Sequence, residues 1–287
     1  GWHIECSAMS SKYLGQPFDI HGGGSDLIFP HHENEIAQSE GATGGEFARY
    51  WLHNGMVTVE QEKMSKSLGN FLTIREALTK TTSEALRLVL LSTHYRMPLD
   101  FSMQKVEEAE KGLTRIYETL ARVDATLGNP SESRTPNPEP RTVPDGPRTL
   151  PNELRILFCE AMDDDCNTAR ALGVVFDGIR ELNRALDAGQ TAEVPGLRHE
   201  LAAIGSVLGI MREVPSQFLE AQKQRGLVQT QLTPEVIEQL ITERTAARKA
   251  KDFKRGDAIR DQLAEQGVIL KDSPTGTTWT MDSGRKA

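Results

Sequence analysis

The apolar positions divide the chain into an N-terminal part of mixed pattern and a longer part dominated by helices. Up to about Leu72, short extended runs at 18–21 and 55–60 flank an amphipathic segment at 30–40 that predicts a helix. This mixture predicts an α/β domain at the N-terminal side of the chain.

Beyond Leu72 the apolar residues step by three and four, which is the period of a helix. Thr73 and Glu76 predict a capping box, and Ser102 is placed to cap the clearest helix of the chain. The apolar positions of this helix are Val106, Ala109, Leu113, Ile116, Leu120, Val123 and Leu127. Two further helices run through Leu172, Val175, Phe176, Ile179, Leu182 and Leu186, and through Leu197, Leu201, Ile204, Leu208 and Met211. Together these helices predict a bundle.

A proline-rich stretch interrupts the helical part. Residues 129–151 hold seven of the fourteen prolines and almost no large apolar residue, which predicts a disordered insertion. Thr233-Pro234 predicts another helix start, and Gly267 predicts a helix end. Val268–Leu270 and Thr277–Met281, separated by a turn sequence, predict a small C-terminal hairpin.

Composition narrows the class of protein. The 287 residues, 38% hydrophobic and 26% charged, are typical of a soluble globular protein of about two domains. The longest apolar run, Ala171–Phe176, excludes a membrane span, and no secretory signal is visible. Three cysteines make no disulfide framework and favour a cytoplasmic location. The net charge of -8 argues against a protein that coats polyanions but permits a local basic face.

The segment Lys63-Met64-Ser65-Lys66-Ser67 carries two ammonium groups three residues apart. Such groups can close over a polyphosphate and match the charge that develops as a bond to the α-phosphate breaks. Most polar stretches of this length are only solvated loops. This string, however, resembles the Lys-Met-Ser-Lys-Ser sequence of class I aminoacyl-tRNA synthetases, and the resemblance implies catalytic roles for Lys63 and Lys66.

A glycine-rich segment forms a second candidate site. Gly22–Gly24 follow a short apolar run, and Asp26 stands two residues after Gly24. Glycines let the backbone approach a ligand closely, and a carboxylate can accept hydrogen bonds from ribose hydroxyls, although the segment could also be only a tight turn. At this distance before the lysine motif, Gly24 and Asp26 resemble the ATP ribose site of class I synthetases, in which Lys66 would also contact ATP.

Cys6, His31 and Glu35 offer a thiolate, an imidazole and a carboxylate. His31 and Glu35 are four residues apart, so a helix would place them on one face, which is zinc-ligand spacing. His32 is an alternative to His31 because it lies three residues from Glu35. The simpler interpretation is a small buried cysteine and a histidine that hydrogen-bonds at a helix start. A His-Glu-x-x-His zinc site is excluded because Ile36, and not a histidine, stands three residues after Glu33.

Three segments together, 1–9, 21–35 and 62–71, resemble the cysteinyl-tRNA synthetase family. The resemblance implies ATP-dependent activation of L-cysteine, with Mg2+, and its transfer to tRNA(Cys). It also implies one zinc ion per chain, held by Cys6, His31, Glu35 and a further cysteine from an earlier part of the enzyme. Zinc suits the task because it binds a thiolate much better than the hydroxyl of serine. Trp2 would form part of the pocket wall, and His21 would bind substrate or brace the loop.

The resemblance also implies an architecture. Residues 1–82 would be the C-terminal part of a Rossmann-like α/β catalytic domain. Residues 83–128 and 152–230 would be a helical tRNA-binding bundle, and 231–287 a small α+β anticodon-binding module. An early His-x-Gly-His string is absent, so we expect a portion of a longer monomeric enzyme that is inactive by itself.

Two other functions stay open. A cysteine ligase that acts on an amino-sugar would share the zinc residues and the lysine motif but would not need an anticodon module. A non-catalytic tRNA-binding paralogue would not need the intact lysines and zinc residues.

Charge marks two more segments of the C-terminal half. Seven Lys or Arg and two Asp lie between Arg244 and Arg260, which suits phosphate contacts. Phe253 could stack a base, although an inward-turned Phe is the commoner role. The resemblance implies that Arg248, Asp257 and Asp272 read anticodon bases. The acidic run 163–168 is interpreted as a solvated helix cap.

Overall fold

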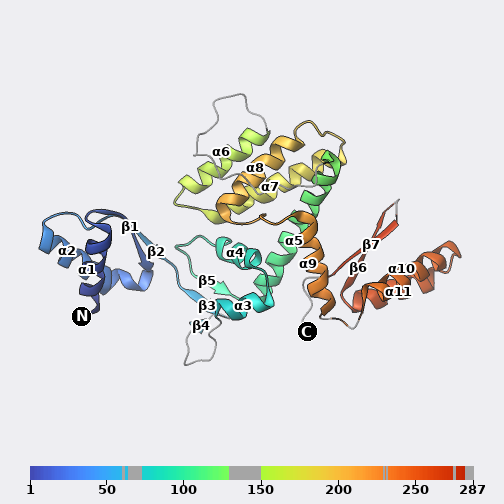
Figure 1. The fold of residues 1–287 in the computed structure, drawn as a ribbon, viewed down its shortest axis with the longest axis horizontal. Helices are drawn as coiled ribbons and strands as arrows, with labels where there is room; N and C mark the ends of the chain where they lie inside the picture. Colours follow the sequence, from blue (N-terminus) through green and yellow to red (C-terminus); the bar gives the residue numbers. More distant parts are fainter. Residues whose placement is uncertain are drawn as a thin grey trace.

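The computed structural model describes residues 1–59, 62–63, 73–128, 150–228, 230, 232–273 and 276–281. Figure 1 shows a small α/β unit at one end, a helical bundle in the middle, and two helices with a hairpin at the other end. No helix in the described part of the chain combines the length and apolarity needed to cross a membrane.

The N-terminal unit surrounds a short parallel sheet. Its elements are α1 (Trp2–Leu14), β1 (Phe18–Gly24), a 3-10 turn (Ser25–Leu27), a π-helical turn (Ile28–His32), α2 (Glu33–Thr43) and β2 (Ala48–Asn54). β1 and β2 are parallel, and Gly23 pairs with His53. The predicted extended run and following helix are confirmed, with the α-helix beginning later than expected at Glu33. Helix α1 was not predicted, because its apolar residues form no clear stripe.

A three-stranded sheet follows, in the order β4-β3-β5. Its strands are β3 (Val57–Val59), β4 (Glu62–Lys63) and β5 (Leu99–Phe101), and α3 (Ile74–Lys80) and α4 (Ser83–Leu91) lie between β4 and β5. The predicted capping box is confirmed, since the Thr73 hydroxyl accepts from the Glu76 amide and the Glu76 carboxylate accepts from the Thr73 amide.

The bundle consists of α5 (Met103–Leu127), α6 (Leu150–Asp163), α7 (Thr168–Asp187), α8 (Val194–Leu208) and α9 (Pro215–Val228). Ser102 caps α5 as predicted, by accepting from the Lys105 amide. One hydrophobic cluster, from Ala85 to Phe218, joins these helices to α4 and β5. The prediction of disorder up to residue 151 is wrong at its end, because α6 already begins at Leu150; residues 129–149 lie outside the described part of the chain.

The C-terminal elements have their own apolar cluster. They are α10 (Pro234–Lys249), α11 (Phe253–Glu265), β6 (Val268–Ser273) and β7 (Gly276–Met281). The helix start at Pro234 and the antiparallel hairpin are confirmed. The buried members of this cluster are Leu227, Ile237, Ile241, Ile259, Leu263, Val268 and Trp279. Helix α9 contacts β7, where Lys223 Nζ lies 4.5 Å from the ring centroid of Trp279.

Candidate metal centre and nucleic-acid surface

Packing of α1 against α2 brings together three side chains that are far apart in the sequence. One ligand atom from each of Cys6, His31 and Glu35 lies within 4.8 Å of the others. His31 comes from the π-helical turn and Glu35 from the first turn of α2, and both are buried. The set of residues expected from the sequence is therefore a cluster in space.

Glu35 lies at the centre of this cluster with no solvent exposure. His31 Nε2 lies 2.5 Å from its Oε1, and His21 Nε2 lies 3.0 Å from its Oε2. Each carboxylate oxygen thus faces an imidazole nitrogen, which offsets part of the cost of burying this group. Thiolate, imidazole and carboxylate are all zinc ligands, so these residues fit a zinc ion.

Further imidazoles, those of His32, His53 and His3, lie next to the Cys6–His31–Glu35 cluster. His32 belongs to another possible ligand set, with His21 and Glu35, and its Nδ1 lies 2.8 Å from His53 Nε2. His3 Nδ1 lies 2.6 Å from His31 Nδ1. Of the two adjacent histidines, His31 shares a possible ligand set with Cys6, whereas His32 shares one with His21. Sequence reasoning missed His3 and His53, because pairing of β1 with β2 and packing of α1 bring them to the cluster.

Burial governs the protonation of these groups. Burial, reinforced by the charge of Glu35, raises the pKa of the Cys6 thiol. Burial lowers the pKa of His21 despite the opposing charge of Glu35. Burial, together with His21 and His53, lowers the pKa of His32 to about 4. His32 is therefore neutral near pH 7, with a ring nitrogen free of a proton.

The end of β1 is shaped by close contacts. A Cβ added at Gly23 would lie 2.7 Å from Cε1 of His32, and one added at Gly24 would collide with the Asp26 carboxylate. Asp26 is exposed in the 3-10 turn that follows the strand. Side chains at the carboxyl ends of parallel strands are placed to meet ligands. Gly24 and Asp26 thus lie in contact at the carboxyl end of β1.

The remaining catalytic candidates are placed only in part. The Trp2 ring stacks on His31 with centroids 4.1 Å apart, and its side chain is 57% exposed. Trp2 therefore borders the cluster on its solvent side. Lys63 ends strand β4, of which the backbone is described. Lys66 lies outside the described residues.

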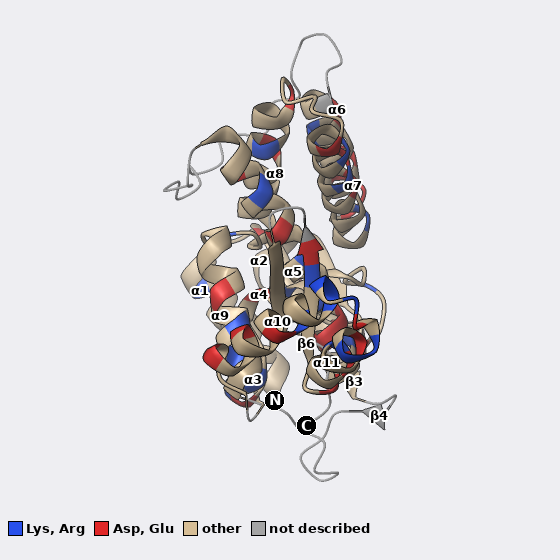
Figure 2. Cartoon of the chain, turned by 90° about the vertical axis from the view of Figure 1, so that its right-hand side faces the viewer, with Lys and Arg blue, Asp and Glu red and all other residues tan. Residues whose placement is uncertain are grey.

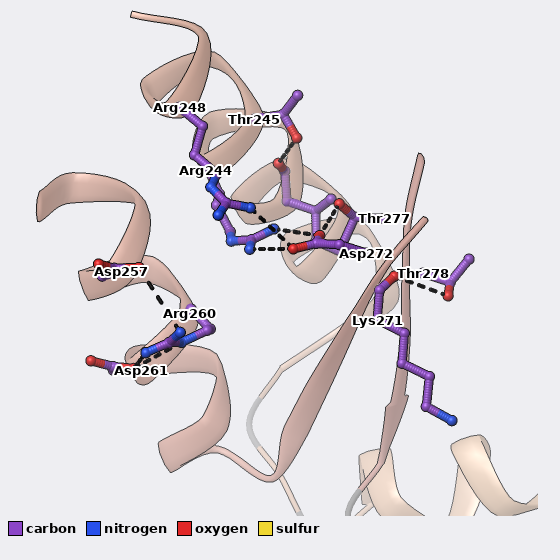
Figure 3. Close-up of polar contacts among 11 residues, drawn as sticks. Arg244, Thr245, Arg248, Asp257, Arg260, Asp261, Lys271, Asp272, Thr277 and Thr278 are labelled. Atoms are coloured by element: carbon purple, nitrogen blue, oxygen red, sulfur yellow. Dashed lines mark hydrogen bonds and ion pairs between the residues drawn. The ribbon is translucent and has the colours of Figure 1, made fainter. Parts of the chain in front are cut away.

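Arg248 and Asp272, two of the three predicted anticodon contacts, lie within hydrogen-bond distance of each other. Figure 3 shows Arg244 and Arg248, on α10, pointing toward Asp272 on β6. Arg244 donates two hydrogen bonds of 2.8 and 2.7 Å to Asp272, and Arg248 donates one of 3.1 Å. Arg244 thereby holds the pKa of Asp272 well below its usual range. Asp257 lies apart on α11, 4.0 Å from Arg260.

The predicted basic face is mixed in charge. Figure 2 shows acidic and basic residues interspersed on α10 and α11, and Arg244 is buried rather than presented to solvent. The expectation that Phe253 turns inward is wrong, because its side chain is 60% exposed at the first position of α11. Ile259 and Leu263, further along α11, fill the core instead.

The interpretation of the acidic run as a solvated helix cap is confirmed in part, since Asp163, Asp164 and Asp165 are exposed. Asn167 caps α7 by accepting from the Arg170 amide. Asp165, however, accepts hydrogen bonds from Tyr95 and Arg96, which lie in the segment between α4 and β5. The sequence gives no signal for these contacts, because Arg96 and Tyr95 precede Asp165 by 69 and 70 positions.

Three segments match known protein families. Residues 1–111 match the class I (C) tRNA synthetase catalytic domain. Residues 157–212 match the DALR domain, and residues 230–279 match the cysteinyl-tRNA ligase anticodon binding domain.

Curated relatives match almost the whole chain. A protein from Geobacter metallireducens named cysteine--tRNA ligase is 55% identical over 284 residues, covering 97% of this chain and 58% of the relative. A protein of the same name from Geotalea daltonii is 53% identical over 294 residues, covering 98% of this chain and 59% of the relative. The chain thus spans less than two thirds of the length of these relatives.

Proposed function

Because this chain belongs to the cysteinyl-tRNA synthetase family, we propose that the enzyme containing it activates L-cysteine with ATP and transfers it to tRNA(Cys). The observation that carries this proposal is the cluster of Cys6, His31 and Glu35, in which His31 and Glu35 are buried. A thiol-selective metal centre is what an enzyme needs to distinguish cysteine from serine, since a hydrophobic pocket resolves such small differences by only about 1 to 3 kcal/mol. The match of residues 230–279 to an anticodon binding domain favours tRNA over an amino-sugar as acceptor.

Cys6, His31 and Glu35 would hold zinc, together with a cysteine from an earlier part of the enzyme. When bound, zinc would favour a thiolate over a hydroxyl as an additional ligand and would lower the pKa of the substrate thiol. His21 braces Glu35 through Nε2, and His3 contacts the far side of the His31 ring. Such outer contacts orient metal ligands. Trp2 would cover the cysteine side chain and exclude water.

Nucleotide would bind next to this centre. Asp26 would accept hydrogen bonds from the ribose hydroxyls of ATP, and Gly24 would let the backbone approach the nucleotide. Lys63 and Lys66 would neutralise the triphosphate with Mg2+ and stabilise the charge that moves onto pyrophosphate as the adenylate forms.

The rest of the chain would bind tRNA. We assign residues 1–82 to the catalytic domain, 83–128 and 152–230 to the tRNA-binding bundle, and 231–287 to the anticodon-binding module. Within the second range we place β5, and the segment that leads into it, with the catalytic sheet, because β5 pairs with β3 and Tyr95 accepts from the Gly55 amide. Arg248, Asp257 and Asp272 would contact the anticodon. We expect the enzyme to act as a cytoplasmic monomer.

The test is amino-acid-dependent exchange of pyrophosphate into ATP by the complete enzyme. L-cysteine should support exchange, and L-serine at the same concentration should not. Charging of tRNA(Cys) but not of a tRNA with a different anticodon should follow. Exchange that is equally fast with serine would contradict the proposed metal-based selection.

A further inference from the structure

The turn between α6 and α7 has an unusual backbone. Asp165 and Cys166 both have left-handed conformations, with φ of 54° and 55°, although neither is glycine. Side chains other than those of glycine rarely adopt such φ values, and consecutive examples persist only where surrounding contacts hold them. The Asp165 carboxylate makes such contacts, with Tyr95 and Arg96.

Three consecutive residues of a distant segment surround that carboxylate. The Tyr95 hydroxyl donates to Oδ1 at 2.7 Å, and Arg96 donates to both oxygens through Nε and Nη2. His94 Nε2 lies 3.9 Å from Oδ2. These donors hold the pKa of Asp165 at about 2, so the carboxylate is charged throughout the physiological range. A single exposed ion pair stabilises little, but a carboxylate shared by a guanidinium and a phenol has fixed geometry.

The segment held by Asp165 is fastened to the three-stranded sheet. The Gly55 amide donates to the Tyr95 carbonyl at 2.7 Å, and the Leu99 amide donates to the Met56 carbonyl at 2.9 Å. A Cβ at Gly55 would collide with the Met97 carbonyl, so the two backbones lie in direct contact. The contacts therefore run without interruption from the bundle turn to the start of β3.

Strand β3 pairs with β5 on one side and with β4 on the other. β4 ends at Lys63, the first residue of the Lys-Met-Ser-Lys-Ser motif. We propose that Asp165 is a positioning residue: by clamping Tyr95 and Arg96, it fixes the β4-β3-β5 sheet, and with it the strand that leads into the motif, relative to the helical bundle. The kinetic consequence rests on the proposed function, whereas the mechanical one does not.

The mechanical test is hydrogen exchange of the full-length protein. Asp165→Asn should speed exchange of the Gly55 and Leu99 amides by about fivefold, the order expected for losing an exposed charge network. Asp164→Asn is the matched control, because Asp164 is in the same turn and lies 3.8 Å from Arg170 of α7. Unchanged exchange at both amides in Asp165→Asn would overturn the proposal.

The kinetic test separates positioning from tRNA binding. Asp165→Asn should lower kcat for cysteine-dependent pyrophosphate exchange about tenfold, as positioning effects can, with little change in KM for ATP. Arg96→Ala should cause a similar loss that does not add to that of Asp165→Asn, and Arg96→Lys should recover part of it. If Asp165→Asn left pyrophosphate exchange normal and only raised the KM for tRNA in aminoacylation, the positioning role would be overturned. A wild-type enzyme without any exchange activity would instead refute the proposed function and leave the hydrogen-exchange result standing.

Discussion

The hydroxyl of Tyr117, on α5, donates a 2.9 Å hydrogen bond to the carboxylate of Glu84, on α4. The same carboxylate accepts hydrogen bonds from the amides of Met211 and Arg212, so it joins α4 and α5 to the segment that enters α9. Glu84→Ala should lower the free energy of unfolding by about 1–3 kcal/mol, because it leaves buried donors unpaired. Urea denaturation measures this loss.

The same glutamate should make stability depend on pH. Burial raises the pKa of Glu84 above its ordinary 4.5, although three hydrogen bonds oppose the shift. The folded protein then binds this proton more tightly than the unfolded chain does. Its contribution to stability is therefore complete below pH 4.5 and lost as the pH rises through the folded-state pKa. Glu84→Gln should remove this dependence, and Glu108→Gln, at an exposed position of α5, should retain it.

Metal content tests the cysteine–histidine–glutamate cluster. The complete wild-type protein should hold one zinc ion per chain, and Cys6→Ser should weaken zinc binding at least about tenfold, because a hydroxyl is a much poorer ligand than a thiolate. Elemental analysis after dialysis measures occupancy. Cys166→Ser, at an exposed cysteine outside the cluster, is the control and should keep its zinc. Full occupancy in Cys6→Ser would exclude Cys6 as a ligand.

Lys66 should act mainly on the transition state. Negative charge moves toward pyrophosphate only as the adenylate forms, so Lys66→Ala should slow pyrophosphate exchange by about two orders of magnitude or more. ATP affinity should change much less. Lys80→Ala, at an exposed lysine at the end of α3, is the control. Equal losses in rate and in ATP affinity would mean that Lys66 only binds nucleotide.

Position 23 should require glycine, because the ring of His32 packs directly against its backbone. Gly23→Ala would push a methyl group against the buried ring of His32, which should cost about 1–3 kcal/mol as overpacking does. Gly41→Ala places its methyl in open space on α2 and should stabilise that helix by about 0.5–1 kcal/mol. Thermal unfolding distinguishes them. A Gly23→Ala protein as stable as the wild type would mean that His32 can move.

Arg244 and Arg248 should separate folding from RNA binding. Arg244 is buried, so Arg244→Ala should destabilise the C-terminal module by about 1–3 kcal/mol, with the half-exposed Asp272 limiting the loss. Arg248 is half exposed, so Arg248→Ala should spare stability and weaken tRNA binding. Titrations with matched and anticodon-swapped tRNA at two salt concentrations measure this. An equal loss for both RNAs would identify Arg248 as a phosphate contact rather than a base contact.

Local sequence determined most of the helices. The stripe from Val106 to Leu127, the Ser102 cap and the Thr73–Glu76 capping box act over one or two turns, so their chemistry can be read without a fold. The His31–Glu35 spacing is local in the same sense. Helix α1 was missed because its apolar residues form no stripe, and tertiary packing stabilises it.

Only the tertiary structure decided which distant groups meet. Packing of α1 on α2 brings Cys6 to Glu35, and strand pairing brings His53 to His32. Folding also turned expected surface groups into structural ones: Arg244 is buried against Asp272, and Asp165 binds Tyr95 and Arg96. Spacing along a chain specifies neighbours within a helix or strand, whereas these contacts depend on burying several apolar faces at once.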